Sequence, residues 1–161
     1  AEYMAERVGR PTSDVAQILV DDIEELMASR EIPWMPGAAE LHEQLIAAGV
    51  AQALVSNSWR ELMDSVLERL DTVFDVVIAG DEVARPKPDP MPYVTACRLL
   101  GVSTSQTVVL EDSPTGVRSA LAAGCAVVGV PQDSELPEHP RLTVVESLAS
   151  VDVQMLRSLV A

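Results

Sequence analysis

The chain has 161 residues, of which 48% are hydrophobic and 3% aromatic, enough for one domain with an Ala-, Val- and Leu-rich core plus a small appendage. Its formal net charge of −14 argues against binding to the phosphate backbone of nucleic acid. Cys97 and Cys125 lack metal-type spacing and read as reduced core thiols. No leader-like segment and no apolar run of about 18 residues occurs, so we expect a cytoplasmic protein with no membrane segment.

Residues 1–33 have the pattern of a helical segment that differs from the rest of the chain. Thr12 or Ser13 can cap a helix whose apolar positions recur at spacings of three and four. Its acidic positions lie on the other side of that helix and are expected to be a solvated face. Prolines at Pro33 and Pro36 then break the pattern, and we place a domain boundary after residue 33.

From residue 34 to residue 161, predicted helices and strands alternate. Apolar runs predict strands near 51–56, 76–79, 107–111, 126–130 and 142–145. Helices are predicted over 38–48, from a capping box at Ser58 to Leu70, from 89 to 100, from 113 to 123 and from a cap at Asp152. Strands separated by helices of 10–15 residues are typical of an α/β protein with a parallel sheet.

The most informative stretch runs from Thr107 to Gly124 and reads as a buried strand, two carboxylates and a helix. Ser113 can cap that helix, and Gly124 can close it. Glu111 and Asp112 therefore fall at the carboxyl end of a strand, where open α/β sheets bind ligands. Adjacent carboxylates repel each other unless donors or a cation hold them, and Mg²⁺ is a natural partner. An exposed acidic pair that only caps the helix is the plainer alternative.

Polar residues follow two more of the predicted strands. One strand delivers Ser56 and Asn57, and another leads to Lys87, which stands between two prolines. A hydroxyl, an ammonium and an acidic pair at one sheet edge favour phosphate and metal chemistry. Each residue taken singly reads more simply as a turn or surface residue, but their order and spacing favour a common site.

Four segments resemble the haloacid dehalogenase superfamily, in the branch of β-phosphoglucomutase and phosphoglycolate phosphatase. They are Met35–Leu41, Ala53–Ser58, Arg85–Pro90 and Val108–Gly124, within a match over residues 34–131. The resemblance implies a Rossmann-like parallel sheet in residues 34–161, with residues 1–33 as the remaining part of a helical cap.

The resemblance also implies a function and a set of site residues. Ser56, with Asn57 beside it, would bind phosphate, Lys87 would be the catalytic lysine, and Glu111 and Asp112 would hold Mg²⁺, with Asp112 as the more direct ligand. The implied activity is a Mg²⁺-dependent phosphatase that acts on a small phosphorylated metabolite through a phospho-aspartate.

The chain departs from this family in one respect. The family carries its nucleophile in a D-x-D motif at the end of a first, central strand, and no D-x-D occurs in these 161 residues. We therefore expect an N-terminally incomplete chain, inactive by itself. Between the strands that end at Ser56 and Glu111, two apolar strand edges should face a gap.

Other functions fit less well or stay open. A phosphoacceptor receiver domain needs its lysine after the acidic residues, and a nucleotide-binding module needs a G-x-G-x-x-G motif that is absent. A non-catalytic paralogue that binds a phosphorylated ligand or a partner stays open, as does a phosphomutase. The sequence settles neither the substrate nor the oligomeric state.

Overall fold

The computed structural model describes residue 11 and residues 33–132 and 134–160. Its contacts divide the chain into two units, Ala1–Pro33 with Glu61–Thr72, and Trp34–Arg60 with Val73–Ala161. The predicted partial cap over residues 1–33 lies almost entirely outside the described residues and stays a prediction. The second unit contains all the strands and candidate site residues described below.

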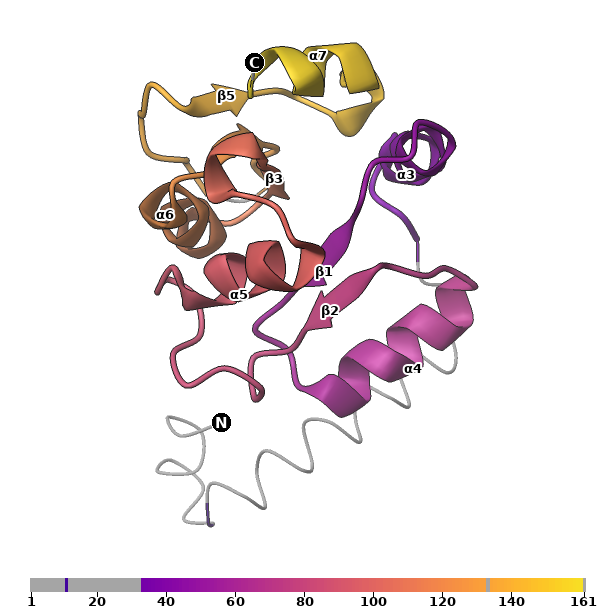
Figure 1. Ribbon diagram of the computed structural model, residues 1–161, viewed down its shortest axis with the longest axis vertical. Coiled ribbons are helices and arrows are strands. Elements are labelled where there is room, and N and C mark those ends of the chain that lie inside the picture. The colour runs from indigo at the N-terminus through magenta and orange to yellow at the C-terminus, as the bar shows by residue number, and fades with distance from the viewer. Residues whose placement is uncertain (1–10, 12–32, 133, 161) are drawn as a thin grey trace. The chain divides into compact units, whose positions relative to one another are not determined.

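The strands form two parallel sheets, and this confirms the predicted α/β class. Strands β1 (Ala53–Val55) and β2 (Val76–Ile78) pair with each other. Strands β3 (Val108–Glu111), β4 (Ala126–Gly129) and β5 (Leu142–Val144) form a second sheet in that order. Figure 1 shows β3 set apart from β1, so the expected gap between these two strands is present.

The register of the ladders is consistent with strands that are buried on both faces. Val109 lies opposite Val127 and Val128 opposite Thr143. Val127 and Val128 follow each other in β4, point to opposite faces, and are both fully buried. A parallel strand covered on both sides reads as a continuous apolar run, which is why these strands were predictable from the sequence.

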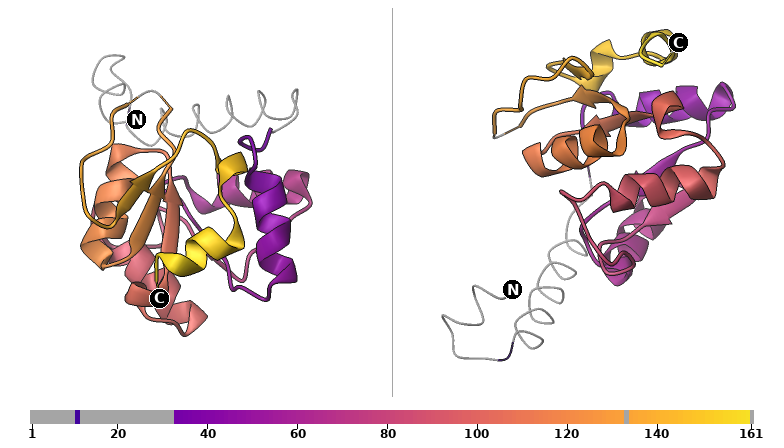
Figure 2. Two further views of the ribbon diagram at one scale, coloured as in Figure 1. Left: turned by 90° about the horizontal axis from the view of Figure 1, so that it is seen from above. Right: turned by 60° about the vertical axis from the view of Figure 1, so that its left-hand side comes forward.

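Five α-helices are described in residues 33–132 and 134–160, and all lie close to their predicted positions. They are α3 (Ala38–Ala47), α4 (Arg60–Leu70), α5 (Met91–Leu100), α6 (Pro114–Ala123) and α7 (Val153–Ser158). Short 3-10 turns at Thr104–Gln106 and Leu148–Ser150 precede β3 and α7. Helices α3 and α7 contact each other and lie side by side in Figure 2. None of the described helices is long and apolar enough to cross a membrane.

Two of the three helix caps predicted at Ser58, Ser113 and Asp152 are present in the structure. Ser113 Oγ accepts a hydrogen bond from the Gly116 N–H at 3.0 Å, and Asp152 Oδ1 accepts one from the Met155 N–H at 2.7 Å. The capping box predicted at Ser58 is wrong in its details. Helix α4 begins at Arg60, whose N–H donates to the distant Asp81 carboxylate at 3.0 Å.

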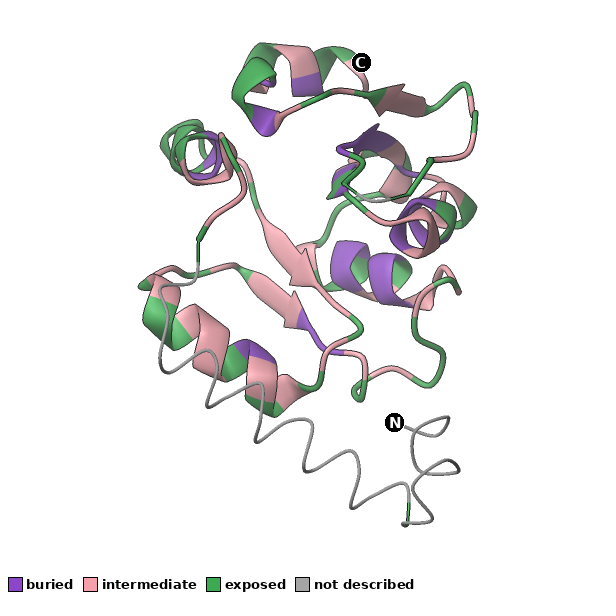
Figure 3. Ribbon diagram, turned by 180° about the vertical axis from the view of Figure 1, so that it is seen from behind, coloured by how far each residue is buried: buried purple, intermediate pink, exposed green. Residues whose placement is uncertain are grey.

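Two apolar clusters lie on opposite sides of β3 and β4. The first packs α3 and α7 against Val128, and the second packs α5 and α6 against Val127. Figure 3 shows the buried residues on α3, α5 and α6, with exposed residues on their other faces. Because helices cover both sides of the strands, polar groups at the carboxyl ends of the strands are the part of the sheet left open to a ligand.

Candidate functional site

A cavity of about 400 Å³ lies at the carboxyl ends of β1 and β3. All five residues that the sequence singled out contribute to its wall, namely Ser56, Asn57, Lys87, Glu111 and Asp112. The structure therefore brings the predicted residues together at one place. Their chemical roles stay predictions.

The side chain of Lys87 is held at the wall of this cavity by protein groups. Its Nζ donates to the Val55 carbonyl at 2.9 Å and to Glu111 Oε1 at 2.5 Å. It also lies 4.9 Å from the centre of the Tyr93 ring, a favourable position for a cation. An ammonium has three hydrogens. One hydrogen therefore remains for an anion in the cavity.

Glu111 is a buried carboxylate whose two oxygens are both engaged. Only 6% of its side chain is exposed. Besides Lys87, the Tyr93 hydroxyl donates to Oε1, and the Ser113 hydroxyl donates to Oε2 at 3.1 Å. Burial, followed by the nearby charge of Glu111, raises the pKa of the Tyr93 phenol far above its usual range, so Tyr93 is a permanent donor.

Gly116 makes room for the Glu111 carboxylate against helix α6. A Cβ atom at this position would lie 2.0 Å from the carboxylate oxygens, far inside van der Waals contact. The Glu111 carboxylate lies beside the start of this helix, where the Ser113 N–H approaches Oε2 at 3.5 Å. A glycine inside the first turns of α6 is therefore needed for packing, despite its low helix propensity.

Asn57 contacts the backbone of Lys87 with both ends of its side-chain amide. Its Nδ2 donates to the Lys87 carbonyl at 3.1 Å, and its Oδ1 accepts from the Lys87 N–H at 3.0 Å. This pair of bonds joins the end of β1 to the proline-rich loop. Asn57 thus positions Lys87 in this structure, and the predicted contact of Asn57 with substrate stays a prediction.

Ser56 has a hydroxyl that can still donate. Its Oγ accepts a hydrogen bond from the Ser58 N–H at 3.0 Å, and no described residue accepts its hydroxyl hydrogen. The Ser56 N–H itself donates to the Ile78 carbonyl at 3.0 Å, which fixes the end of β1 against β2. The hydroxyl is therefore anchored on one side and free to bond an oxygen in the cavity.

The two carboxylates that were predicted to hold Mg²⁺ differ in their surroundings. Asp112 is exposed on the cavity wall and makes no hydrogen bond or ion pair with a described residue. Glu111 is committed to Lys87, Tyr93 and Ser113. Among the described residues, no group of three or more His, Cys, Asp and Glu side chains could hold a metal ion. A hard cation here would depend on Asp112 and on oxygen ligands from elsewhere.

Two residues, Tyr93 and Gly116, have roles in this site that were not predicted from the sequence. Tyr93 falls in the helix predicted from 89 to 100, and Gly116 falls in the helix predicted from 113 to 123. A signal was present in each case. Tyr93 brings a hydroxyl to an otherwise apolar helix face, and a buried Tyr hydroxyl usually finds a partner. An acid at the end of a buried strand needs such donors.

Comparison with known proteins agrees with this arrangement. The family model described as haloacid dehalogenase-like hydrolase matches residues 2–130. The chain belongs to this family.

Among curated haloacid dehalogenase-like relatives, validoxylamine A 7'-phosphate phosphatase of Streptomyces hygroscopicus subsp. limoneus is 37% identical over 139 residues. That match covers 76% of this chain and 65% of the relative. Protein CbbY of Rhodobacter capsulatus is 35% identical over 68% of this chain and 50% of the relative. The chain thus spans between half and about two thirds of these two relatives' length.

Two solved structures share the fold of this chain. CbbY from Rhodobacter sphaeroides in complex with phosphate superposes with a TM-score of 0.83 at 29% identity, covering 91% of this chain and 68% of that one. A second structure of CbbY from the same organism, in complex with xylulose-(1,5)bisphosphate, also has a TM-score of 0.83, at 30% identity over 91% of this chain and 68% of that one.

Proposed function

We propose that this chain is the larger part of a Mg²⁺-dependent phosphatase that acts on a small phosphorylated metabolite. The observation that carries the proposal is the ammonium of Lys87, which protein groups hold at the wall of a cavity that also receives the Ser56 hydroxyl. A relative whose name states a phosphatase supports the same reaction class.

Ser56 and Lys87 would bind the phosphoryl group. The remaining hydrogen of the Lys87 ammonium and the Ser56 hydroxyl hydrogen are the donors available to phosphoryl oxygens. Donors that are already fixed before the reaction stabilise charge that develops in the transition state without a reorganisation cost. Asn57 and Glu111 contribute by holding Lys87 from its backbone and from its ammonium, respectively.

Asp112 would hold the magnesium ion, with Glu111 in the shell behind it or as a further ligand. When bound, Mg²⁺ would offset negative charge on the phosphoryl group. The incomplete set of described ligands leads us to expect weak Mg²⁺ binding by these 161 residues.

The attacking group would come from outside these residues. Covalent catalysis through a phospho-aspartate requires a carboxylate in line with the phosphorus atom. None of Ser56, Lys87 and Asp112 is expected in that position, and the sequence has no D-x-D. We therefore expect no phosphatase turnover by this chain above that of its Lys87→Ala variant.

The test compares this chain with a version extended upstream through a strand that carries D-x-D. The extended protein should hydrolyse small phosphate monoesters only with Mg²⁺. In it, Asp112→Ala should abolish activity, and Lys87→Ala should cost a few kcal/mol of transition-state stabilisation in kcat/KM. Arg85→Ala, a change of an exposed residue in the same loop, is the control and should keep activity.

Three results would redirect the proposal. Mg²⁺-dependent turnover by the 161-residue chain, lost in Lys87→Ala, would show that a nucleophile lies within it. An extended protein that binds phosphate esters but never hydrolyses them would favour the alternative of a non-catalytic paralogue, which the missing D-x-D keeps open. Transfer of phosphate to a second sugar phosphate instead of water would identify a phosphomutase.

A further inference from the structure

The side chain of Tyr93 contacts both members of the buried ion pair between Lys87 and Glu111. Its hydroxyl donates to Glu111 Oε1, the same oxygen that accepts a hydrogen bond from the Lys87 ammonium at 2.5 Å. The centre of its ring lies 4.9 Å from Lys87 Nζ. One side chain therefore binds the carboxylate with its polar end and lies against the ammonium with its aromatic ring.

Tyr93 is fixed by packing that does not involve the loop of Lys87. It belongs to helix α5, is buried, and lies in the apolar cluster with Cys97, Val109 and Val117. Side chains in a close-packed interior are held in one arrangement. Lys87, in contrast, comes from the segment between β2 and α5. The Tyr93 hydroxyl is therefore a fixed reference point to which the lysine of the loop can be aligned.

The direction of the third ammonium hydrogen depends on where Glu111 Oε1 lies. The Val55 carbonyl accepts one hydrogen of Lys87 at 2.9 Å, and Oε1 accepts a second, so the third points where these two acceptors leave it. The other oxygen of Glu111 is held by longer contacts, from the Ser113 hydroxyl at 3.1 Å and the Ser113 N–H at 3.5 Å. Oε1 itself is held by the Tyr93 hydroxyl.

Packing alone does not require a hydroxyl at this position. A phenylalanine would fill the same space in the apolar cluster and would keep a ring beside the ammonium. A buried hydroxyl without a partner destabilises a protein, so a tyrosine fits here because Glu111 accepts its hydrogen. The hydroxyl thus acts on the ion pair, while the ring alone would serve the core.

We propose that Tyr93 is a positioning residue for phosphoryl transfer, which acts through Glu111 Oε1 to direct the third hydrogen of the Lys87 ammonium into the cavity. This inference rests on the proposed function of Lys87. A donor whose direction is already fixed stabilises charge that develops in the transition state without having to reorient. Binding of the substrate depends less on this direction, because a mobile ammonium still attracts a phosphate group. Loss of the hydroxyl should therefore lower kcat and leave KM nearly unchanged.

The first experiment observes the ammonium directly and needs neither substrate nor activity. Lys87 is the only lysine in the 161 residues, so this chain labelled with isotopic lysine gives a single side-chain ammonium signal in NMR. The ammonium should exchange its hydrogens with water slowly, because protein groups accept two of them. In Tyr93→Phe, which keeps the ring and loses the hydroxyl, the exchange should be about fivefold faster at the same pH and temperature.

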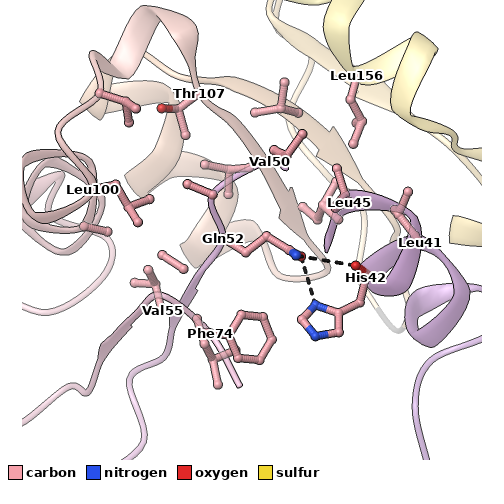
Figure 4. Close-up of a pocket in the computed structure, with 18 of the residues that line it drawn as sticks. Leu41, His42, Leu45, Val50, Gln52, Val55, Phe74, Leu100, Thr107 and Leu156 are labelled. Carbon is pink, nitrogen blue, oxygen red and sulfur yellow. Dashed lines mark hydrogen bonds between the residues drawn. The ribbon is translucent and has the colours of Figure 1, made fainter. Parts of the chain in front are cut away.

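The second experiment measures kcat and KM in the version extended upstream through D-x-D. Tyr93→Phe should lower kcat about tenfold and change KM less than about twofold. Thr107→Val is the matched control, because it also removes a hydroxyl beside α5. That hydroxyl donates to the Ser103 carbonyl at 2.9 Å and lies 3.4 Å from Cys97 Sγ. Figure 4 shows Thr107 near Leu100, the last residue of α5. Both kinetic constants should stay within about twofold in this control.

Four results would overturn the inference. The first is an unchanged exchange rate of the ammonium in Tyr93→Phe. The second is an unchanged kcat in this variant, with or without a rise in KM. The third is an equal fall of kcat in Thr107→Val, which would indicate a general loosening of α5. The fourth is an unaltered extended protein without turnover, which overturns the proposed function as well. The exchange rate is measured separately, so that failure is distinguishable from a hydroxyl that does not hold the ion pair.

Discussion

Replacing Lys87 with methionine tests whether the buried ion pair organises the candidate site. The Lys87 and Glu111 side chains are 10% and 6% exposed, so the change leaves a buried carboxylate without its cation. Loss of a charge-assisted hydrogen bond costs about 1.5–3 kcal/mol, and an uncompensated buried charge costs about 3–5 kcal/mol. Tyr93 and Ser113 still donate to Glu111, so we expect a loss of about 3 kcal/mol in the free energy of unfolding.

A double-mutant cycle separates the pair from other effects of each substitution. Glu111→Gln alone leaves the Lys87 ammonium without its anion, and Lys87→Met with Glu111→Gln removes both charges. The double variant should be less destabilised than the sum of the single variants by more than about 1 kcal/mol, since the two groups are in direct contact.

An exposed ion pair of the same loop is the control. Arg85 lies 3.3 Å from Asp89, and its side chain is 66% exposed. Arg85→Met should therefore change the free energy of unfolding by less than about 0.5 kcal/mol, as exposed pairs contribute little.

Urea denaturation followed by tryptophan fluorescence suits this measurement. Trp34 and Trp59 both belong to the unit that contains the site. Two results would refute the idea that the ion pair holds the site together. One is a loss of less than about 1 kcal/mol in the free energy of unfolding for Lys87→Met. The other is a double variant whose loss equals the sum of the losses of the two single variants.

Three further outcomes follow from the same network. Gly116→Ala should lower the free energy of unfolding by about 2 kcal/mol in calorimetry, although alanine favours helices, because its Cβ would collide with Glu111. Above about pH 10 the unfolded state loses the Tyr93 proton and the folded state keeps it, so stability falls as pH rises, by up to about 1.4 kcal/mol per pH unit. Tyr93→Phe should lower this slope by the Tyr93 contribution, while the buried Cys125 thiol, whose pKa is raised to about 12, keeps a contribution of its own. An unchanged slope would contradict the assignment. Asn57→Ala should speed cleavage of the loop around Lys87 by a protease of broad specificity, because both anchoring bonds to its backbone are lost.

The strands could be predicted from the sequence because a strand buried on both faces is a continuous run of apolar residues. Such a run can be identified without knowing which strands lie beside it. Val127 and Val128 are an example, since both are fully buried on opposite faces of β4. The site residues could be proposed because the carboxyl ends of parallel strands meet at one edge of a sheet.

The details that depend on distant partners could not be predicted in this way. The start of α4 is fixed by Asp81, which lies 21 residues after Arg60 in the chain. The sequence around Ser58 offers a local cap that looks sufficient by itself. In the same way, no local pattern shows that Gly116 is required by a carboxylate five positions earlier, because that need arises only when Lys87 and Tyr93 fix the carboxylate in place.

The two adjacent carboxylates at the end of β3, Glu111 and Asp112, have different surroundings. The difference determines how the negative charge of each one is compensated. Two neighbouring acids repel each other unless donors or cations compensate their charges. For Glu111 the compensating cation is Lys87 of the chain itself, assisted by the Tyr93 hydroxyl. Asp112 has no such partner among the described residues and lies exposed on the cavity wall. The uncompensated charge at this edge is therefore that of Asp112, and a cation drawn to the cavity would meet that carboxylate first.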